Sequence, residues 1–96
     1  MSRNPLPRYL AELGERIVAD GIHTGHDDLL LIADAARADS PAAAAALIDP
    51  DEPEVARQRA LAVASAAVLR NTAASRSLRH ALVDDVAPSD RWPVAA

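Results

Sequence analysis

The apolar residues of this chain recur at helical spacing, and this pattern restricts its possible folds more than any other feature. Leu6, Leu10, Leu13 and Ile17 follow one another at intervals of 4, 3 and 4, which places them on one face of a helix. No stretch alternates between apolar and polar residues over the length of a strand, and the sequence has no internal repeat. The sequence therefore predicts an all-α fold, a small bundle of four to five short helices.

Capping residues predict where the first two helices begin and end. The first helix is expected to end near Gly21, which takes a left-handed cap conformation while Ile22 folds back onto Ile17. The second is expected to begin after Thr24, with Asp27 as the distal residue of a capping box. These two capping signals place a short loop between the first and the second helix.

The remaining helices follow from prolines and from clusters of polar residues. Ser40 followed by Pro41 predicts a short third helix over the alanine run 42–46. A capping box of Asp51 and Glu54 predicts a fourth helix over about 52–70, central in the bundle, and the polar stretch 71–77 predicts a break before a last helix over about 75–85.

Gly14 stands inside the first predicted helix. Glycine costs a helix about 1 kcal/mol relative to alanine. We therefore expect another helix to pass close to this position.

The apolar residues are numerous but small. The 96 residues include 23 Ala and 22 Leu, Ile or Val, with one Trp, one Tyr and no Phe. Burying one of the larger aliphatic side chains contributes roughly 1.5 to 3 kcal/mol, whereas ordering a residue costs about 1.5 kcal/mol. A core of this size often needs a second chain to complete it, so we expect a homodimer or a complex with another protein.

The second helix has two apolar faces, which is typical of a helix between two neighbours. One face holds Leu29 and Ile32, and the other holds Leu31, Ala35 and Ala38. One neighbour is expected to belong to another subunit, with Leu31 nearest to it. The predicted partner interface consists of Leu29, Leu31, Ile32, Ala35, Ala38, Leu61 and Val68.

The charges are distributed unevenly along the chain. The net charge of −4 argues against general attraction to nucleic acids. Residues 55–83 nevertheless contain five Arg and no acid. An alternative function is therefore a small DNA-binding regulator, helix-turn-helix-like or antitoxin-like, in which Arg70, Arg76 and Arg79 contact nucleic acid.

The same basic stretch has a second explanation. It is able to lie against the acidic first half of the chain, where Asp34, Asp39 and Asp49 are candidate counter-charges. Each exposed pair of this kind contributes less than about 1 kcal/mol.

No chemistry is indicated by the polar residues. His23, His26, Asp27 and Asp28 lie within six residues, but their spacing matches no strong metal motif, and such residues are common where a helix begins. The chain has no Cys, and its serines do not form a nucleophile elbow. We expect no catalytic residue, metal or cofactor, and a function as a non-enzymatic adaptor or regulator.

The sequence also predicts where the protein is located and how the chain ends. No apolar run reaches the roughly 20 residues of a membrane span, and no signal peptide is visible, so a cytoplasmic location is expected. The use of Arg without Lys suggests a bacterial genome rich in GC. Residues 1–86 are expected to form one helical domain and residues 87–96 an extended tail, with Trp92 docking on the bundle or binding a partner.

Overall fold

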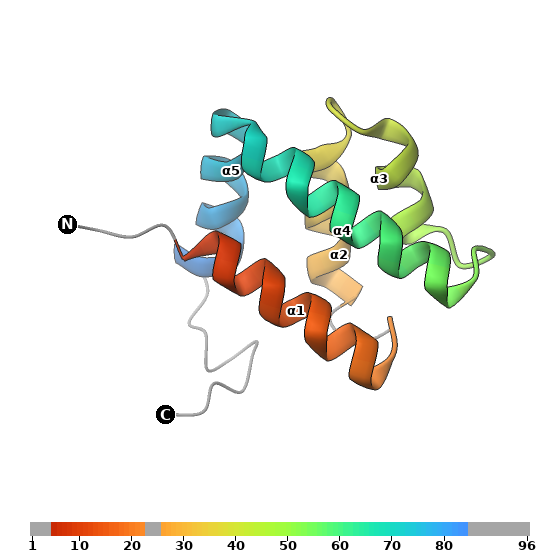
Figure 1. Cartoon of the computed structure of the whole chain (residues 1–96). Helices are drawn as coiled ribbons and strands as arrows, with labels where there is room; N and C mark the ends of the chain where they lie inside the picture. Colours follow the sequence, from red (N-terminus) through yellow and green to blue (C-terminus); the bar gives the residue numbers. More distant parts are fainter. Residues whose placement is uncertain (1–4, 23–25, 85–96) are drawn as a thin grey trace.

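Five α-helices and a π-helical turn make up most of residues 5–22 and 26–84, which the computed structural model of the protein describes (Figure 1). These elements are α1 (Leu6–Asp20), α2 (His26–Ala36), α3 (Pro41–Ile48), α4 (Glu54–Arg70), α5 (Thr72–Arg79) and η1 (His80–Asp84). No strand occurs within these two described ranges. The prediction of an all-α bundle of short helices is confirmed.

Helix α4 lies at the centre of the arrangement. It contacts α1, α2, α3 and α5. It runs antiparallel to α1, as the colours of Figure 1 show, with the start of α1 beside the end of α4. The predicted central position of this helix is therefore correct, but α4 is not surrounded, because Val55, Val63 and Leu69 are exposed.

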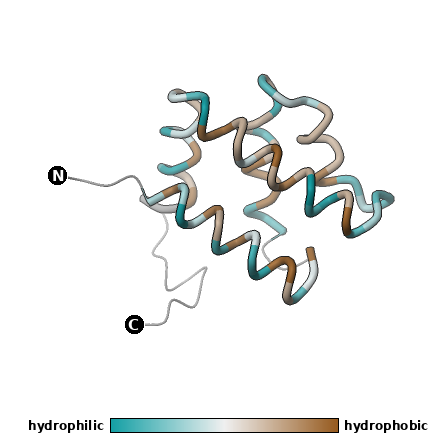
Figure 2. The backbone as a smooth tube through the Cα atoms, viewed as in Figure 1, coloured by the Kyte–Doolittle hydropathy of each residue, from teal (hydrophilic) through white to brown (hydrophobic). Residues whose placement is uncertain are grey.

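The apolar stripe of α1 forms part of the core, as predicted. Leu6, Leu10, Leu13 and Ile17 are all buried, and the alternation of apolar and polar residues along α1 is visible in Figure 2. Proline in the first turn suits the start of this helix, because the backbone N–H that proline lacks would have no helical partner there.

Gly21 ends α1 in a conformation that differs from the predicted one. Its φ of 100° is positive, as expected, but its ψ of 158° is extended rather than left-handed helical. The Gly21 N–H donates to the Ile17 carbonyl oxygen at 2.8 Å, and Ile22 is buried in the same core cluster as Ile17. The extended ψ directs the chain inward directly after the helix.

Proline, rather than a side-chain capping hydrogen bond, marks the start of α3 and of α4. Helix α3 begins at Pro41 after Ser40, as predicted, but the Ser40 hydroxyl makes no capping hydrogen bond. Helix α4 begins at Glu54 with Pro53 as its N-cap, and the predicted capping box is absent from this start. Proline disfavours a helical conformation in the residue before it, which moves the helix start past Pro53.

Asn71 alone separates α4 from α5. Its side-chain oxygen accepts a hydrogen bond from the Ala74 N–H at 3.1 Å, and its amide nitrogen donates to Asp39 Oδ2 at 3.2 Å. The break was predicted in this stretch, but α5 begins at Thr72, earlier than the predicted position 75. Asn71 is an effective N-cap, so no longer linker is needed. Thr24, predicted to cap α2, lies outside the described residues.

A part-buried hydrogen bond joins α1 to α2. The Tyr9 hydroxyl donates to Asp28 Oδ2 at 2.5 Å, and Asp28 is only 2% exposed. A buried carboxylate that loses a donor keeps its desolvation cost without the compensating bond.

We expect Tyr9→Phe to lower the free energy of unfolding by about 1 to 3 kcal/mol, because it removes this donor and leaves the ring in place. Urea denaturation followed by circular dichroism measures the change. Ser77→Ala is the control, since it also removes a hydroxyl but from an exposed position of α5, and a change within about 0.5 kcal/mol is expected there. A Tyr9→Phe variant as stable as the control would show that the bond contributes little.

Candidate functional site

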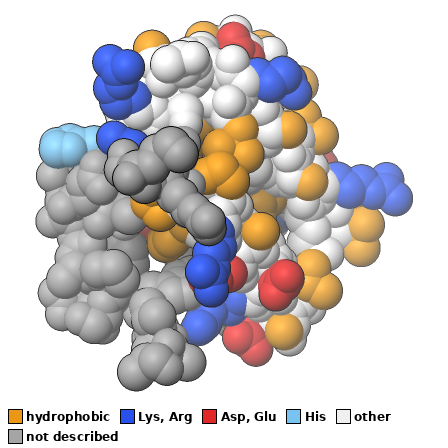
Figure 3. Space-filling view, turned by 60° about the vertical axis from the view of Figure 1, so that its left-hand side comes forward, with side chains coloured by type: hydrophobic (Ala, Val, Ile, Leu, Met, Phe, Trp, Pro, Cys, Tyr) orange, Lys and Arg blue, Asp and Glu red, His pale blue; other side chains and the backbone are white. Residues whose placement is uncertain are grey.

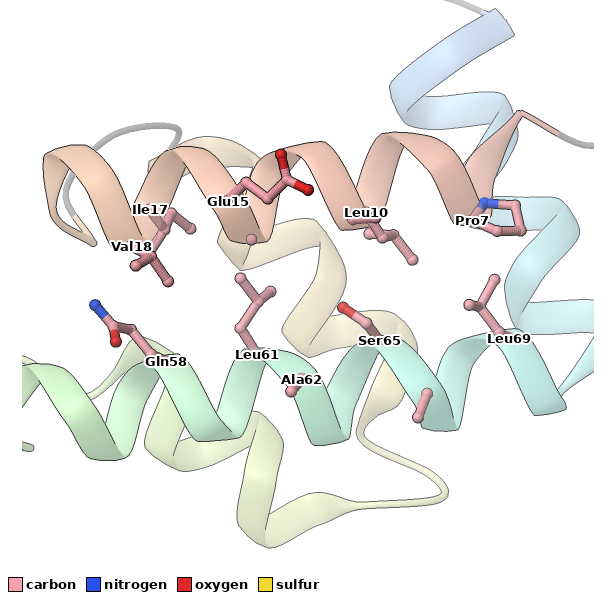
Figure 4. A pocket seen from close by; sticks show the side chains of 13 residues that line it. Pro7, Leu10, Glu15, Ile17, Val18, Gln58, Leu61, Ala62, Ser65 and Leu69 are labelled. Carbon is pink, nitrogen blue, oxygen red and sulfur yellow. The ribbon is translucent and has the colours of Figure 1, made fainter.

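An open apolar groove, here called the α1–α4 groove, runs between α1 and α4 (Figure 4). Its volume is about 660 Å³, within the range of roughly 300 to 1,000 Å³ that is typical of binding pockets. Its lining consists of Pro7, Leu10, Ala11, Gly14, Glu15, Ile17, Val18, Gln58, Leu61, Ala62, Ser65, Ala66 and Leu69.

Each wall of the groove is a stripe that lies one residue after a core stripe. On α1, the core stripe is followed by Pro7, Ala11, Gly14 and Val18. On α4, the buried Leu61, Ala64 and Val68 are followed in the same way by Ala62, Ser65 and Leu69, and Gln58 extends this stripe by one turn. Both wall stripes have intervals of 4, 3 and 4. One step along a helix rotates a side chain by about 100°, so each helix presents one face to the core and the adjacent face to the groove.

The two stripes face each other along their whole length. Figure 4 shows Leu69 opposite Pro7 at one end and Gln58 opposite Val18 at the other. In each stripe, the last residue follows the first by eleven positions, which corresponds to about 16 Å at the rise of an α-helix. The groove is therefore as long as three helical turns.

Gly14 faces open space. A Cβ atom built at this position has no neighbour within 4 Å among the described residues. The predicted close helix crossing is therefore not made within the protomer. The glycine gives up about 1 kcal/mol of helix stability and gains no packing in return.

Ser65 provides a polar point in the apolar groove. Figure 4 shows its hydroxyl turned from α4 toward α1. The Ser65 Oγ atom is buried and has no hydrogen-bond partner among the described residues. A buried hydroxyl usually finds a partner, so this atom is suited to an occupant that donates a hydrogen bond.

Large apolar side chains stand at the ends of the groove. Val18 is 69% exposed and Leu69 is 38% exposed. In the space-filling view of Figure 3, apolar side chains gather near the middle of the visible face and charged side chains stand around it. Contiguous exposed apolar surface of this kind marks interaction sites in proteins.

The structure divides the predicted partner interface into core and surface. Leu29, Ile32 and Val68 are fully buried in the core of a single chain, where they fill the space between helices and leave no surface for a partner. This corrects the expectation for those three residues. Leu61 is also largely buried, but it lines the α1–α4 groove.

The second predicted face of α2 is partly exposed. Leu31 is 37% exposed, Ala38 is exposed, and Ala35 is half-buried against the core. The neighbouring Leu30 and Asp34 of α2 are exposed as well.

Two of the three predicted nucleic-acid contacts lie together. Arg76 and Arg79 line a hollow of about 290 Å³ with Leu69, Thr72 and Ser75, and Arg70 is not part of its lining. Arg79 is half-buried. A helix-turn-helix joins its helices by a turn of three to four residues, whereas Asn71 is the only residue between α4 and α5.

The acidic residues proposed as counter-charges make other contacts. Asp34 pairs with Arg37 on its own helix at 3.5 Å, and Asp49 Oδ1 accepts from the Asp51 N–H. Asp39 accepts the hydrogen bond from Asn71 described above. Arg57 of the basic stretch donates to the Leu47 carbonyl oxygen at 3.1 Å, which fastens α4 to α3.

The described part of the chain offers no metal site. No group of three or more His, Cys, Asp or Glu residues within 5–22 and 26–84 is arranged to hold an ion. Asp28 is bonded to Tyr9 and His26 is exposed, while His23 lies outside the described residues. Over the same ranges, no helix combines the length and apolar character needed to cross a membrane.

The sequence contains a signal for the groove that the predicted helix faces do not include. A second stripe follows the core stripe of α1 by one residue, and a similar stripe lies on α4. Their members are mostly small or neutral, so they do not stand out as an apolar face.

Comparison with protein families, with curated proteins and with solved structures finds no match to this chain. The functional proposal below is therefore based on the geometry of the groove.

We expect Gly14→Ala to raise the free energy of unfolding by about 0.5 to 1 kcal/mol, because the added Cβ enters open space and alanine favours the helix. Thermal and urea denaturation measure it. Gly21→Ala is the contrasting variant: its positive φ is unfavourable for alanine, so we expect it to lower stability. A destabilising Gly14→Ala would mean that position 14 is more crowded than its geometry indicates.

Proposed function

We propose that the protein is a non-enzymatic interaction module, an adaptor or regulator, that pairs with a second copy of itself through the α1–α4 groove. The open groove with Gly14 facing empty space is the observation that carries this proposal. A helix tolerates the cost of glycine most readily where another backbone has to approach closely.

A pair of helices is a suitable occupant because the groove is apolar, runs along two helices and is lined in its middle by small side chains. Small side chains such as Ala11, Gly14 and Ala62 allow helix axes to approach to about 8 Å. Two copies facing each other would bring α1 and α4 of each together as a four-helix arrangement, in which the wall stripes take the positions of a bundle core.

Charge complementarity favours a second copy over an unrelated helix. Glu15 lies at the α1 side of the groove, and the exposed Arg59 follows Gln58 on the α4 side. A two-fold axis parallel to the helices places α1 of one copy against α4 of the other. This arrangement brings Glu15 of each copy toward Arg59 of the other copy, so the contact occurs twice in the dimer.

The groove supports this function better than the other two surfaces do. On α2, Leu31 is 37% exposed but lines neither the groove nor the arginine-lined hollow, and Leu29, Ile32 and Val68 of the predicted interface are in the core. The hollow at Arg76 leaves out Arg70, and the single-residue linker differs from a helix-turn-helix. We therefore retain nucleic-acid binding only as an alternative.

Sedimentation equilibrium over a range of concentrations tests the pairing. We expect a reversible dimer that Val18→Asp weakens at least tenfold, about 1.4 kcal/mol, because a buried charge would stand in an apolar interface. Val63→Asp is the matched control, since Val63 is another exposed valine, on α4, that does not line the groove. A monomer at all concentrations, or equal effects of the two variants, would overturn the proposal.

Gly14→Ala separates pairing from stability. We expect this substitution to stabilise the protomer and yet weaken the dimer, because its methyl group stands where the second copy approaches. A dimer strengthened by Gly14→Ala would contradict the proposed interface.

Exchanging the two charges tests the orientation of the pair. We expect Glu15→Arg and Arg59→Glu each to weaken the dimer by several-fold, since each creates like-charge contacts. The double exchange Glu15→Arg with Arg59→Glu should restore most of the affinity. Additive losses in the double variant would exclude this two-fold arrangement.

A further inference from the structure

We infer that, in an unpaired protomer, Trp92 of the chain's own C-terminal segment 85–96 occupies the α1–α4 groove, so that pairing has to displace it. This regulation rests on the proposed function, because both occupants use the same groove. Residues 85–96 lie outside the described residues. Their sequence and the position at which η1 ends point to this segment.

The groove needs a bulky apolar occupant. Its middle is lined by Ala11, Gly14 and Ala62, whose side chains leave much of the 660 Å³ unfilled. The chain has only two aromatic residues, Tyr9 and Trp92. The Tyr9 hydroxyl is bonded to Asp28, whereas Trp92 brings an indole that buries roughly 150 to 250 Å² on docking.

Trp92 also matches the polar point of the groove. An indole has one N–H donor and no acceptor, and this donor needs a partner when the ring is buried. The Ser65 Oγ atom is buried in the groove and has no partner among the described residues. A hydrogen bond from the Trp92 Nε1–H to Ser65 Oγ would satisfy both groups.

The segment is long enough to reach this position. Helix η1 ends at Asp84 beside the first turn of α1, and both Figure 1 and Figure 4 show the last helical turns near the Pro7 end of α1. Trp92 follows Asp84 by eight residues, which span up to about 26 Å when extended. The groove itself is about 16 Å long.

Attachment to the same chain favours the segment over a second copy in dilute solution. A short tether gives an effective concentration in the millimolar range, well above that of a protein at micromolar concentration. A segment that occupies about nine protomers in ten leaves one in ten competent to pair. Because both partners have to be competent, removal of the indole should tighten pairing by about a hundredfold.

Fluorescence of the single tryptophan tests the inference on the full chain. At concentrations where sedimentation shows protomers, we expect Trp92 emission at shorter wavelength than that of N-acetyltryptophanamide, and protection from acrylamide quenching. Gly14→Leu, which fills the groove, should shift the emission toward that of the free amide. Ala19→Leu is its matched control, since Ala19 is exposed on α1 and does not line the groove.

A second pair of variants tests the hydrogen bond. Ser65→Ala should weaken docking by about threefold to tenfold, the range that corresponds to one typical hydrogen bond. Ser77→Ala, at an exposed position of α5, should leave the emission unchanged. Circular dichroism of each variant verifies that the helices are intact.

Association should then expose the indole. As the concentration rises and dimers form, the emission should move to longer wavelength, and Trp92→Ser should tighten the dimer in sedimentation. Emission equal to that of the free amide in protomers, or insensitivity to Gly14→Leu, would overturn the inference. Protection that develops only on dimerisation would overturn it as well, because the indole would then lie in the partner copy.

The two proposals fail in different ways. A chain that stays monomeric while Trp92 responds to Gly14→Leu and Ser65→Ala would contradict the pairing and retain the docking of the segment. A chain that dimerises through the groove with Trp92 exposed at every concentration would contradict only the inference about the segment.

Discussion

Close approach of α4 to its neighbours, made possible by alanine, is the constraint on which the rest of the structure depends. Ala60, Ala64 and Ala67 are buried on the inward side of α4. Side chains this small allow α4 to contact α1, α2, α3 and α5 at once, so that a modest number of leucines and isoleucines fills the space between the helices. A helix in this central position still cannot be covered on all sides by four short neighbours.

The uncovered side of α4 creates the groove. Helix α1 uses its leucine stripe to pack on the core and presents the adjacent stripe, which contains Gly14, alongside the open face of α4. Small residues on one face of α4 allow close packing inside the bundle, and other small residues, among them Gly14 and Ala62, leave an apolar hollow outside it. A second copy and the tryptophan of the C-terminal segment would both fill this hollow, and competition between them would connect the state of the groove to the concentration of the protein.

Local patterns predicted the helices well and their starts less well. The stripe from Leu6 to Ile17 and the stop at Gly21 were readable because both depend on residues within a few positions of each other. The start of α4 was misplaced because Pro53 excludes the geometry that a capping box at Asp51 requires. The burial of Asp28 was not visible in the sequence, because its partner Tyr9 lies on another helix.

The sequence by itself determined that the chain is helical, where the apolar stripes lie, and that apolar residues are in excess of what short helices bury easily. Only the tertiary structure decided which surface carries that excess. Leu29 and Ile32 were expected at an interface and are in the core, whereas Gly14 and Ser65 line the open groove. The reason is physical: helical spacing fixes which residues share a face, but the packing of neighbouring helices determines which faces are covered.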